Sequence, residues 1–326
     1  KELREIEAKP GVPTYSQVFA DTLARLADMD SRVCAITGAM PNGTGLDRFQ
    51  PKHPDKYYDV GIAEEHAVIF AAGLATQGLK PFCAIYSTFL QRAYDAIVHD
   101  VALQGLPVVF CMDRGGLSPD DGPTHHGLFD IAYLRCVPNL VHMQPKDEDE
   151  FADMLYTALL HEGPICVRYP RGAACGVKMK EKPVRLEIGK GEVIREGGRV
   201  ALWGLGNMLP MALEVAGALE KDGISCSVIN PRFIKPLDEG LLKESAGSAE
   251  VIATFEDHVL SGGFGSAVLE ALSGWGSGVP LVRIGWPDQV VEHGNLPALR
   301  AKHGLTAEAA LAKIRAALAG TGKSGG

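Results

Sequence analysis

The sequence predicts an α/β protein with two doubly wound, mostly parallel sheets, and two observations carry this prediction. Short, nearly continuous apolar runs alternate with longer amphipathic stretches along most of the 326 residues. This alternation is typical of βαβ units, whose helices cover both faces of a parallel sheet. It stops once, after Arg171, where the residues to Gly198 are rich in Lys, Glu and Gly. The length also suits two domains.

The first half of the chain contains a complete series of such units. The expected strands are Val33–Thr37, Pro81–Tyr86, Val108–Met112, Leu140–Met143 and Ile165–Tyr169. The expected helices are Tyr15–Ala27, Glu64–Gln77, Phe89–Leu103 and Glu148–Leu160. A short hairpin is expected at the end of the Gly-rich break.

A second series follows the break. Its expected strands are Val200–Gly204, Ser225–Ile229, Val251–Phe255 and Leu281–Ile284, and its expected helices are Pro210–Lys221, Gly265–Leu272 and Ala307–Leu318. We therefore expect a lead at 1–12, a first domain at 13–172, a linker at 173–198, a second domain at 199–319 and a disordered tail at 320–326.

Composition excludes several classes of partner. The net charge of −8 argues against a nucleic-acid surface. The apolar stretch Ala67–Ala75 is too short to span a bilayer, and no signal peptide opens the chain, so no membrane association is expected. The seven cysteines form no CxxC pair, which indicates buried free thiols in a cytoplasmic protein. Because residue 1 is Lys, not Met, we expect a cleaved start or an upstream segment.

Two segments place polar residues at the carboxyl edge of the first sheet or at a helix start. In the first, residues 59–68, the chain turns into a helix with Glu64 in its first turn, where the helix N-terminus stabilises a carboxylate. In the second, Tyr86 ends a strand at the edge where open α/β sheets place ligands. Arg92, Asp95 and His99 then share one helix face. They are either site residues or an intrahelical ion-pair ladder.

A third segment is the long loop at residues 113–127, which is dense in Gly, Asp, His and Arg and follows a buried strand, as functional loops often do. Adjacent histidines His125 and His126 would point apart, and no third ligand accompanies them, so we expect no metal site. In a fourth segment, Arg168 ends a strand and suits an oxyanion. Alternatively, it is a surface arginine that pairs across the domains. The Gly-rich run 261–266 indicates a tight turn.

Together these segments resemble the 1-deoxy-D-xylulose-5-phosphate synthase family of thiamine-diphosphate-dependent, transketolase-type enzymes. The most specific matches are YSTFLQRAYD at 86–95 followed by HDVALQ at 99–104, and DGPTHHG at 121–127 followed by FD and YLRC. Further matches run in order from about Pro13 to about Ala317. They separate the chain from ordinary transketolase and from the β subunit of 2-oxo-acid dehydrogenase E1. Departures lie at Glu65, where the family has Gln, and in the loop at 115–121.

The resemblance implies a transketolase-like pyrimidine-binding domain followed by a transketolase C-terminal domain. The family binds the diphosphate of its cofactor through Mg²⁺ in a third domain with a Gly-Asp-Gly motif, which does not occur in this sequence. The resemblance therefore implies a partner that supplies this diphosphate-binding N-terminal domain, whether the chain is a fragment, half of a split enzyme or a cleaved piece. It also implies a homodimer.

By the same resemblance, Glu64 is a catalytic residue that contacts the aminopyrimidine of thiamine diphosphate, and Phe89 stacks on that ring. Tyr86, Arg114 and Arg168 surround the phosphate of the acceptor. The remaining matches are Asp121 and His125, near the substrate hydroxyl and the reacting centre, and Arg92, near the mouth of the site.

The implied reaction condenses pyruvate with D-glyceraldehyde 3-phosphate to 1-deoxy-D-xylulose 5-phosphate and CO₂, for isoprenoid precursors and for thiamine and pyridoxal. Without the diphosphate-binding domain the chain is expected to be inactive. Two alternatives remain open. One is half of a split transketolase or an E1 β-like subunit, and the other is a non-catalytic two-domain remnant.

Overall fold

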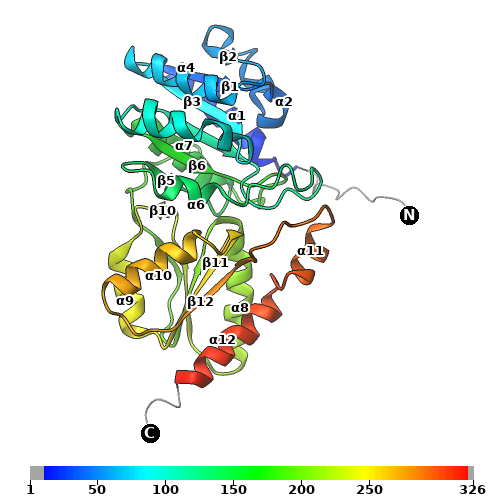
Figure 1. The fold of residues 1–326 in the computed structure, drawn as a ribbon, viewed down its shortest axis with the longest axis vertical. Helices are drawn as coiled ribbons and strands as arrows, with labels where there is room; N and C mark the ends of the chain where they lie inside the picture. Colours follow the sequence, from blue (N-terminus) through cyan, green and yellow to red (C-terminus); the bar gives the residue numbers. More distant parts are fainter. Residues whose placement is uncertain (1–10, 322–326) are drawn as a thin grey trace, which may run out of the picture.

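A computed structural model describes residues 11–321 and contains two sheets that follow each other along the long axis of the molecule (Figure 1). The seven-stranded sheet has the order β10-β5-β6-β4-β3-β1-β2, and the five-stranded sheet has the order β12-β11-β8-β9-β7. All strand pairs are parallel except β10 with β5 and β7 with β9. The predicted fold class is therefore confirmed. The expected lead and tail fall mostly on residues outside the described part.

The first part of the chain builds six of the seven strands. These are β1 (Val33–Thr37), β2 (Tyr57–Asp59), β3 (Lys80–Tyr86), β4 (Val109–Asp113), β5 (Val141–Met143) and β6 (Ile165–Arg168). The helices among them are α1 (Tyr15–Met29), α2 (Pro41–Thr44), α3 (Leu46–Phe49), η1 (Pro54–Lys56), α4 (Glu64–Thr76), α6 (Asp130–Arg135) and α7 (Glu148–Leu160).

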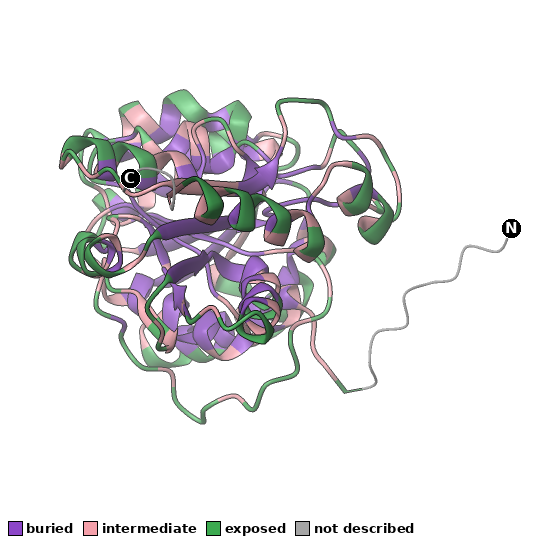
Figure 2. Ribbon diagram, turned by 90° about the horizontal axis from the view of Figure 1, so that it is seen from below, coloured by how far each residue is buried: buried purple, intermediate pink, exposed green. Residues whose placement is uncertain are grey.

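The second part builds the smaller sheet. Its strands are β7 (Glu192–Arg195), β8 (Val200–Gly204), β9 (Cys226–Asn230), β11 (Val251–Val259) and β12 (Leu281–Trp286). Its helices are η4 (Gly206–Met208), α8 (Leu209–Lys221), α9 (Glu239–Ser248), α10 (Phe264–Gly274), α11 (Leu296–Lys302) and α12 (Ala307–Thr321). Figure 2 shows buried residues in the strands and on the inward sides of the helices, whose outward sides are exposed.

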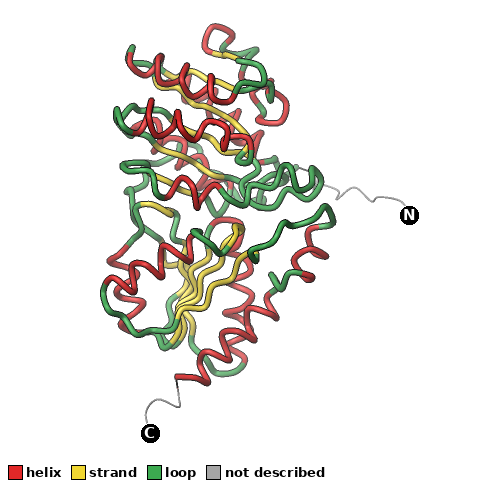
Figure 3. Tube along the Cα trace, in the orientation of Figure 1, coloured by secondary structure: helices red, strands yellow, loops and turns green. Residues whose placement is uncertain are grey.

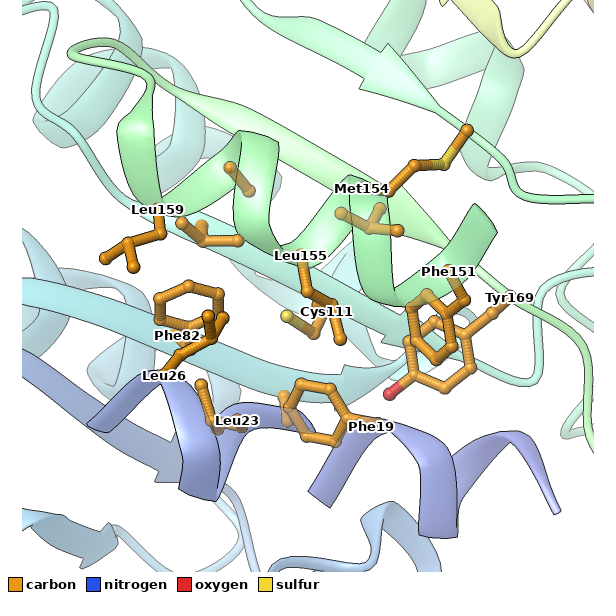
Figure 4. Close-up of a cluster of buried hydrophobic side chains, with 14 of the residues drawn as sticks. Phe19, Leu23, Leu26, Phe82, Cys111, Phe151, Met154, Leu155, Leu159 and Tyr169 are labelled. Carbon is orange, nitrogen blue, oxygen red and sulfur yellow. The ribbon is translucent and has the colours of Figure 1, made fainter. Parts of the chain in front are cut away.

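Successive residues of β3 face two different hydrophobic cores. Phe82 and Ala84 belong to the core shared with α1 and α7, whereas Cys83 and Ile85 belong to the core shared with α4. Side chains of a strand alternate between the faces of a sheet, so helices on both faces require apolar residues at every position. Figure 4 shows the first core, in which side chains of α1 and α7 meet around Phe82.

The expected helix Phe89–Leu103 is irregular. It consists of a 3₁₀ segment, η2 (Phe89–Ala93), one α-helical turn, α5 (Tyr94–Ala96), and a π-helical segment, η3 (Ile97–Ala102). Such changes of helical pitch rotate the side chains that follow them and often occur at functional sites. The single face predicted for Arg92, Asp95 and His99 therefore assumed a regularity that the segment lacks.

The linker at 173–198 is held along α7 and does not form the expected hairpin. Glu148 accepts hydrogen bonds of 2.7–3.1 Å from three successive backbone N–H groups, at residues 175–177. Asp153 accepts one from the backbone of Val184 at 2.7 Å. Further on, β7 pairs with β9 of the second sheet. Carboxylates of α7 thus give the backbone of the linker hydrogen-bond partners that a sheet would otherwise supply.

One strand crosses between the two halves of the chain. The segment Phe233–Lys235 forms β10, which leaves the second half and pairs antiparallel with β5 at the edge of the first sheet. Figure 3 shows that long loops gather on one side of the molecule, close to the segment that leads from β12 to α11. Among residues 11–321, no helix has both the length and the apolar character needed to cross a bilayer.

Candidate active site

Glu64 is the first residue of α4, as predicted, and it is 3% exposed. Gly61, at φ 73°, turns the chain before the helix starts. The carboxylate is stabilised both by the helix N-terminus and by Arg92, whose Nη1 donates to Oε1 at 2.7 Å. A surface pocket of about 380 Å³ opens beside this pair and is lined by Ile62, Ala63, Glu64, Glu65, His66, Ile69 and Arg92.

Three half-buried rings lie next to this ion pair. Tyr86, at the end of β3, stacks on Phe89 with centroids 5.7 Å apart and an interplanar angle of 16°. His125, from the long loop, packs against Phe89 in a T-shaped arrangement with centroids 5.1 Å apart. The guanidinium carbon of Arg92 lies 4.9 Å from the Phe89 centroid. Arg92 therefore joins the Glu64 carboxylate to the aromatic group.

Arg114 continues the group on the other side of Tyr86. It directly follows β4 and has φ 58°, a left-handed conformation that is uncommon outside glycine. The buried Asp113 accepts hydrogen bonds from the Arg114 backbone at 2.7 Å, from its Nη1 at 2.9 Å and from Ser16 Oγ at 2.7 Å. Burial raises the pKa of Asp113, and the Arg114 charge opposes this increase. Backbone strain of this kind often marks a functional site.

Asp121 lies at the far end of this group. Ser118 Oγ donates to Asp121 Oδ2 at 2.9 Å, and Arg114 Nε lies 3.9 Å from the same oxygen. Arg171 Nη1 is 3.2 Å from Asp121 Oδ2 and 2.9 Å from Asp120 Oδ2. The sequence assigned no role to Arg171, although its position three residues after a strand-end arginine was a usable signal.

Contacts thus link seven of the eight predicted site residues. In order they are Glu64, Arg92, Phe89, His125, Tyr86, Arg114 and Asp121. They come from α4, from the end of β3 with the segment that follows it, and from the loop after β4, which meet at the carboxyl edge of the first sheet, where parallel strands place their loops.

Arg168 does not join this group, and the predicted contact with a substrate phosphate does not fit its position. Its side chain is fully buried, and Nε donates to Asp130 Oδ2 at 2.7 Å. Nη1 donates to Gln144 Oε1 at 2.7 Å, and Nη2 donates to the backbone oxygens of Gly127 and Asp257 at 2.9 and 2.8 Å. Each guanidinium nitrogen already has a protein acceptor. Arg168 does pair across the two halves of the chain, but in the interior and not on the surface.

The two adjacent histidines have different surroundings. His125 is partly exposed, with Nδ1 2.9 Å from Thr124 Oγ1. His126 is 3% exposed and accepts a hydrogen bond at Nδ1 from the backbone of Ser118 at 3.2 Å. Burial lowers the pKa of His126. Within the described part of the chain, no three His, Cys, Asp or Glu side chains are grouped closely enough to bind a metal ion.

Two other expected features have local partners. Arg92 forms its ion pair with Glu64, and His99 Nδ1 lies 3.0 Å from Asp100 Oδ1, so neither contact belongs to an Arg92–Asp95–His99 ladder. At the Gly-rich turn before α10, the backbone N–H groups of residues 264 and 265 donate to the Glu256 carboxylate at 2.6 and 2.9 Å. A side chain of the protein occupies the place that a phosphate would take.

Comparison with known proteins follows the same division of the chain. The family model described as "Transketolase, pyrimidine binding domain" matches residues 12–176, and that described as "Transketolase, C-terminal domain" matches residues 189–309. A solved structure titled "Split gene transketolase, inactive beta4 tetramer" superposes with a TM-score of 0.83 at 31% identity, over 94% of this chain and 98% of that one.

Curated relatives share more of the sequence. The 1-deoxy-D-xylulose-5-phosphate synthase of Acidobacterium capsulatum is 62% identical over 93% of this chain and 48% of its own length. That of Methylacidiphilum infernorum is 63% identical over 91% of this chain and 47% of its own length. The chain therefore spans about half the length of the curated relatives that it matches. With both family models and these relatives in agreement, the chain belongs to the transketolase family of thiamine-diphosphate-dependent enzymes.

Proposed function

We propose that this chain provides the pyrimidine-binding and C-terminal domains of a 1-deoxy-D-xylulose-5-phosphate synthase, which condenses pyruvate with D-glyceraldehyde 3-phosphate and releases CO₂. The observation that carries the proposal is the continuous series of contacts from Glu64 to Asp121 at one sheet edge. A protein that only bound a partner would have no physical need for a buried carboxylate, stacked rings and a strained arginine together. The names of the relatives specify the product, 1-deoxy-D-xylulose 5-phosphate.

The residues fit the pyrimidine half of thiamine diphosphate. Glu64 is a buried carboxylate at the wall of an open pocket, and Phe89 is a half-buried ring that shares Arg92 with it. Glu64 would hold the aminopyrimidine by a hydrogen bond, and Phe89 would stack on the ring. When bound, the cofactor supplies the nucleophilic carbon and the electron sink for decarboxylation. The chain's own contribution is orientation and a carboxyl group that exchanges a proton with the pyrimidine nitrogen.

The acceptor site lies around Arg114. Arg114 Nε and Arg171 Nη1 both lie within 4 Å of Asp121 Oδ2. Two forked cations are therefore close enough together to bind one phosphate. We therefore assign the phosphate to Tyr86, Arg114 and Arg171, with Arg171 in place of Arg168. His125 is partly exposed and packs against Phe89 and Tyr86, where it can hold or release a proton at a substrate hydroxyl.

The whole enzyme contains more than the residues of this site. We propose that residues 13–172 and 199–319 are its two domains here, joined by 173–198, and that the strand β7 within this linker adds to the sheet of the second domain. A diphosphate-binding domain, in the same longer chain or in another, would hold Mg²⁺ and the cofactor diphosphate. We further propose a cytoplasmic homodimer. Without the diphosphate-binding domain, the cofactor has only the pyrimidine contacts of this chain, so no turnover is expected.

A second candidate is half of a split transketolase. The observation in its favour is the match over nearly the full length of a split-gene transketolase chain. The two candidates differ in the donor. A split transketolase would transfer two carbons from a ketose phosphate, whereas the synthase takes pyruvate.

The test is a complementation assay. The chain is mixed with the separately expressed diphosphate-binding domain of a close synthase relative, with thiamine diphosphate and Mg²⁺, and turnover is measured with pyruvate and D-glyceraldehyde 3-phosphate. Activity is expected only in the mixture. Glu64→Gln should reduce kcat about 100-fold or more, because the proton exchange with the pyrimidine is lost. Glu239→Gln, at an exposed position at the start of α9 in the second half of the chain, is the matched control.

Three outcomes would count against the synthase. Turnover by the chain alone would contradict the need for a diphosphate-binding domain. Turnover with a ketose phosphate but not with pyruvate would support the split transketolase. A folded chain that binds the relative's domain but produces no turnover with either donor would support a non-catalytic role.

A further inference from the structure

The loop that carries Asp121 and His125 is closed at its base. Gly116 N–H donates to Gly127 O at 2.8 Å, and Gly127 N–H donates to Gly116 O at 2.8 Å. Residues 117–126 therefore form a closed loop, which we call the catalytic loop. The conformation of its base determines where both side chains lie.

A carboxylate from the second sheet is bound at this base. Asp257 belongs to β11 and is 3% exposed. Its Oδ1 accepts hydrogen bonds from the backbone of Leu117 at 3.3 Å and from Trp286 Nε1 at 2.7 Å. Gly116 has φ 101°, and a Cβ there would overlap Asp257 Oδ2. The close approach of the carboxylate thus explains why residue 116 is glycine.

Arg168 holds the other end of the catalytic loop to the same strand. Its Nη2 donates both to Gly127 O at 2.9 Å and to Asp257 O at 2.8 Å. The next residue after Gly127 is also attached, because the Val259 backbone N–H donates to Leu128 O at 3.1 Å. Both ends of the loop are therefore attached to β11, which belongs to the C-terminal sheet.

A circuit of hydrogen bonds, buried except at the half-buried Asn207, connects these two attachments. Arg168 Nη1 donates to Gln144 Oε1 at 2.7 Å, Gln144 Nε2 donates to Asn207 Oδ1 at 3.1 Å, and Asn207 Nδ2 donates to Asp257 Oδ2 at 2.8 Å. Arginine is only a donor, and an ionised aspartate is only an acceptor. The orientations of the Gln144 and Asn207 amides are consequently determined. If either amide were flipped, two donors or two acceptors would face each other.

We propose that Asp257 is a positioning residue, through which the C-terminal sheet sets the conformation of the catalytic loop and thereby acceptor binding. This inference rests on the proposed function for its kinetic consequence, but its structural consequence can be measured independently. A C-terminal domain that only bound a partner would not need a buried carboxylate against the base of a loop that belongs to the first sheet.

The circuit allows an exchange experiment. In Asp257→Asn, the new amide nitrogen either faces the Asn207 amide as a second donor, which loses one hydrogen bond, or faces the Leu117 and Trp286 donors, which loses two. In Asn207→Asp, two carboxylates face each other. In the double variant the amide introduced at position 257 can donate to the carboxylate introduced at position 207, which still accepts from Gln144. The carbonyl oxygen of that amide accepts from Leu117 and Trp286. The double variant therefore restores the whole circuit with the same net charge.

Two readouts test the proposal on the 326-residue chain and on the complemented enzyme. Hydrogen exchange of residues 117–126 should become about tenfold faster in each single variant and return to near the wild-type rate in the double variant. In the complemented enzyme, kcat/KM for glyceraldehyde 3-phosphate should fall about tenfold or more and recover in the double variant, with KM for pyruvate changed much less. Glu250→Gln, whose carboxylate pairs with Arg199 on the surface beside the start of β11, is the control for both readouts.

The outcomes separate this proposal from the proposed function. Unchanged exchange and kinetics in Asp257→Asn would overturn the positioning role, and so would faster exchange spread over the whole second sheet without rescue by the double variant. If the wild type has no turnover in the complemented mixture, the proposed function fails. The exchange readout then still decides whether Asp257 positions the loop.

Discussion

The guanidinium carbon of Arg114 lies 3.8 Å from the centroid of the Tyr86 ring, so the arginine covers one face of the tyrosine. Arg114 Nη1 also donates to Gly43 O at 2.6 Å. The Tyr86 hydroxyl lies beside Gly43, in space that a Cβ at residue 43 would take. Gly43 follows β1, Tyr86 is the last residue of β3 and Arg114 follows β4, so residues from three different strand ends interlock at one point. Two of them are residues that we assign to the acceptor phosphate.

The interlock predicts a defect from the smallest change at Gly43. In Gly43→Ala the new methyl group overlaps the Tyr86 hydroxyl and shifts a ring held between Phe89 and Arg114. We expect kcat/KM for glyceraldehyde 3-phosphate to fall about 100-fold in the complemented assay, because small misplacements of binding groups have large kinetic effects. Gly73→Ala is the matched control, since a Cβ at this exposed position of α4 meets no atom within 4 Å and should stabilise the helix by about 0.5–1 kcal/mol. Equal activity in the two alanine variants would refute the interlock.

The two arginines near the end of β6 predict opposite phenotypes. Arg168→Met removes the cationic partner of a buried Asp130 and should lower the free energy of unfolding by about 3–5 kcal/mol. Arg171→Met removes a partly exposed cation and should change stability by about 0.5 kcal/mol or less. Its kcat/KM for the acceptor should fall at least about tenfold, because the phosphate loses a charged donor. Urea denaturation and the complemented assay measure both quantities. A stable Arg168→Met protein with an acceptor defect, but with unchanged hydrogen exchange in residues 117–126, would restore Arg168 as the phosphate ligand.

Glu256 predicts how stability depends on pH. Burial raises the pKa of this carboxyl group from 4.5 to about 7, against the lowering effect of the N–H donors of Gly265 and Phe264. The folded state binds this proton more tightly than the unfolded state. The protonated Glu256 therefore makes its full contribution to the free energy of unfolding below about pH 4.5, and this contribution is lost as the pH rises through 7. The wild type should therefore lose about 3 kcal/mol relative to Glu256→Gln between about pH 5 and about pH 8.

The measurement is urea denaturation of both proteins at several pH values, with Glu250→Gln as a surface control. The stability difference between wild type and Glu256→Gln should decrease as the pH rises, whatever its absolute size. A difference that stays constant, or that grows with pH, would show that Glu256 is ionised in the folded protein across this range.

Much of the architecture was predictable because it depends on local sequence. Helices on both faces of a parallel sheet make the strands apolar at every position, and that pattern is visible in Val33–Thr37 and in residues 108–112 without coordinates. The start of α4 at Glu64 was predictable for the same reason, since a turn glycine and a following apolar face are neighbours in the chain. The resemblance of these motifs to a known family then grouped the site residues.

What the sequence did not determine depends on partners distant in the chain. Arg168 and Arg171 look alike as sequence, and only the positions of Asp130, Gln144 and Asp257 make the first a buried tie between the sheets and leave the second beside Asp121.

The crossing of β10 and the attachment of the linker to α7 also depend on partners that are distant in the chain. A three-residue strand carries too little periodicity to be recognised, and an extended linker is ordered only by the carboxylates that it meets. By itself the sequence determined the α/β class, most of the longer strands and helices and the group of candidate residues. The tertiary structure decided which arginine faces the site and which sheet holds the catalytic loop, because hydrogen-bond partners far apart in sequence come together only when the chain is folded.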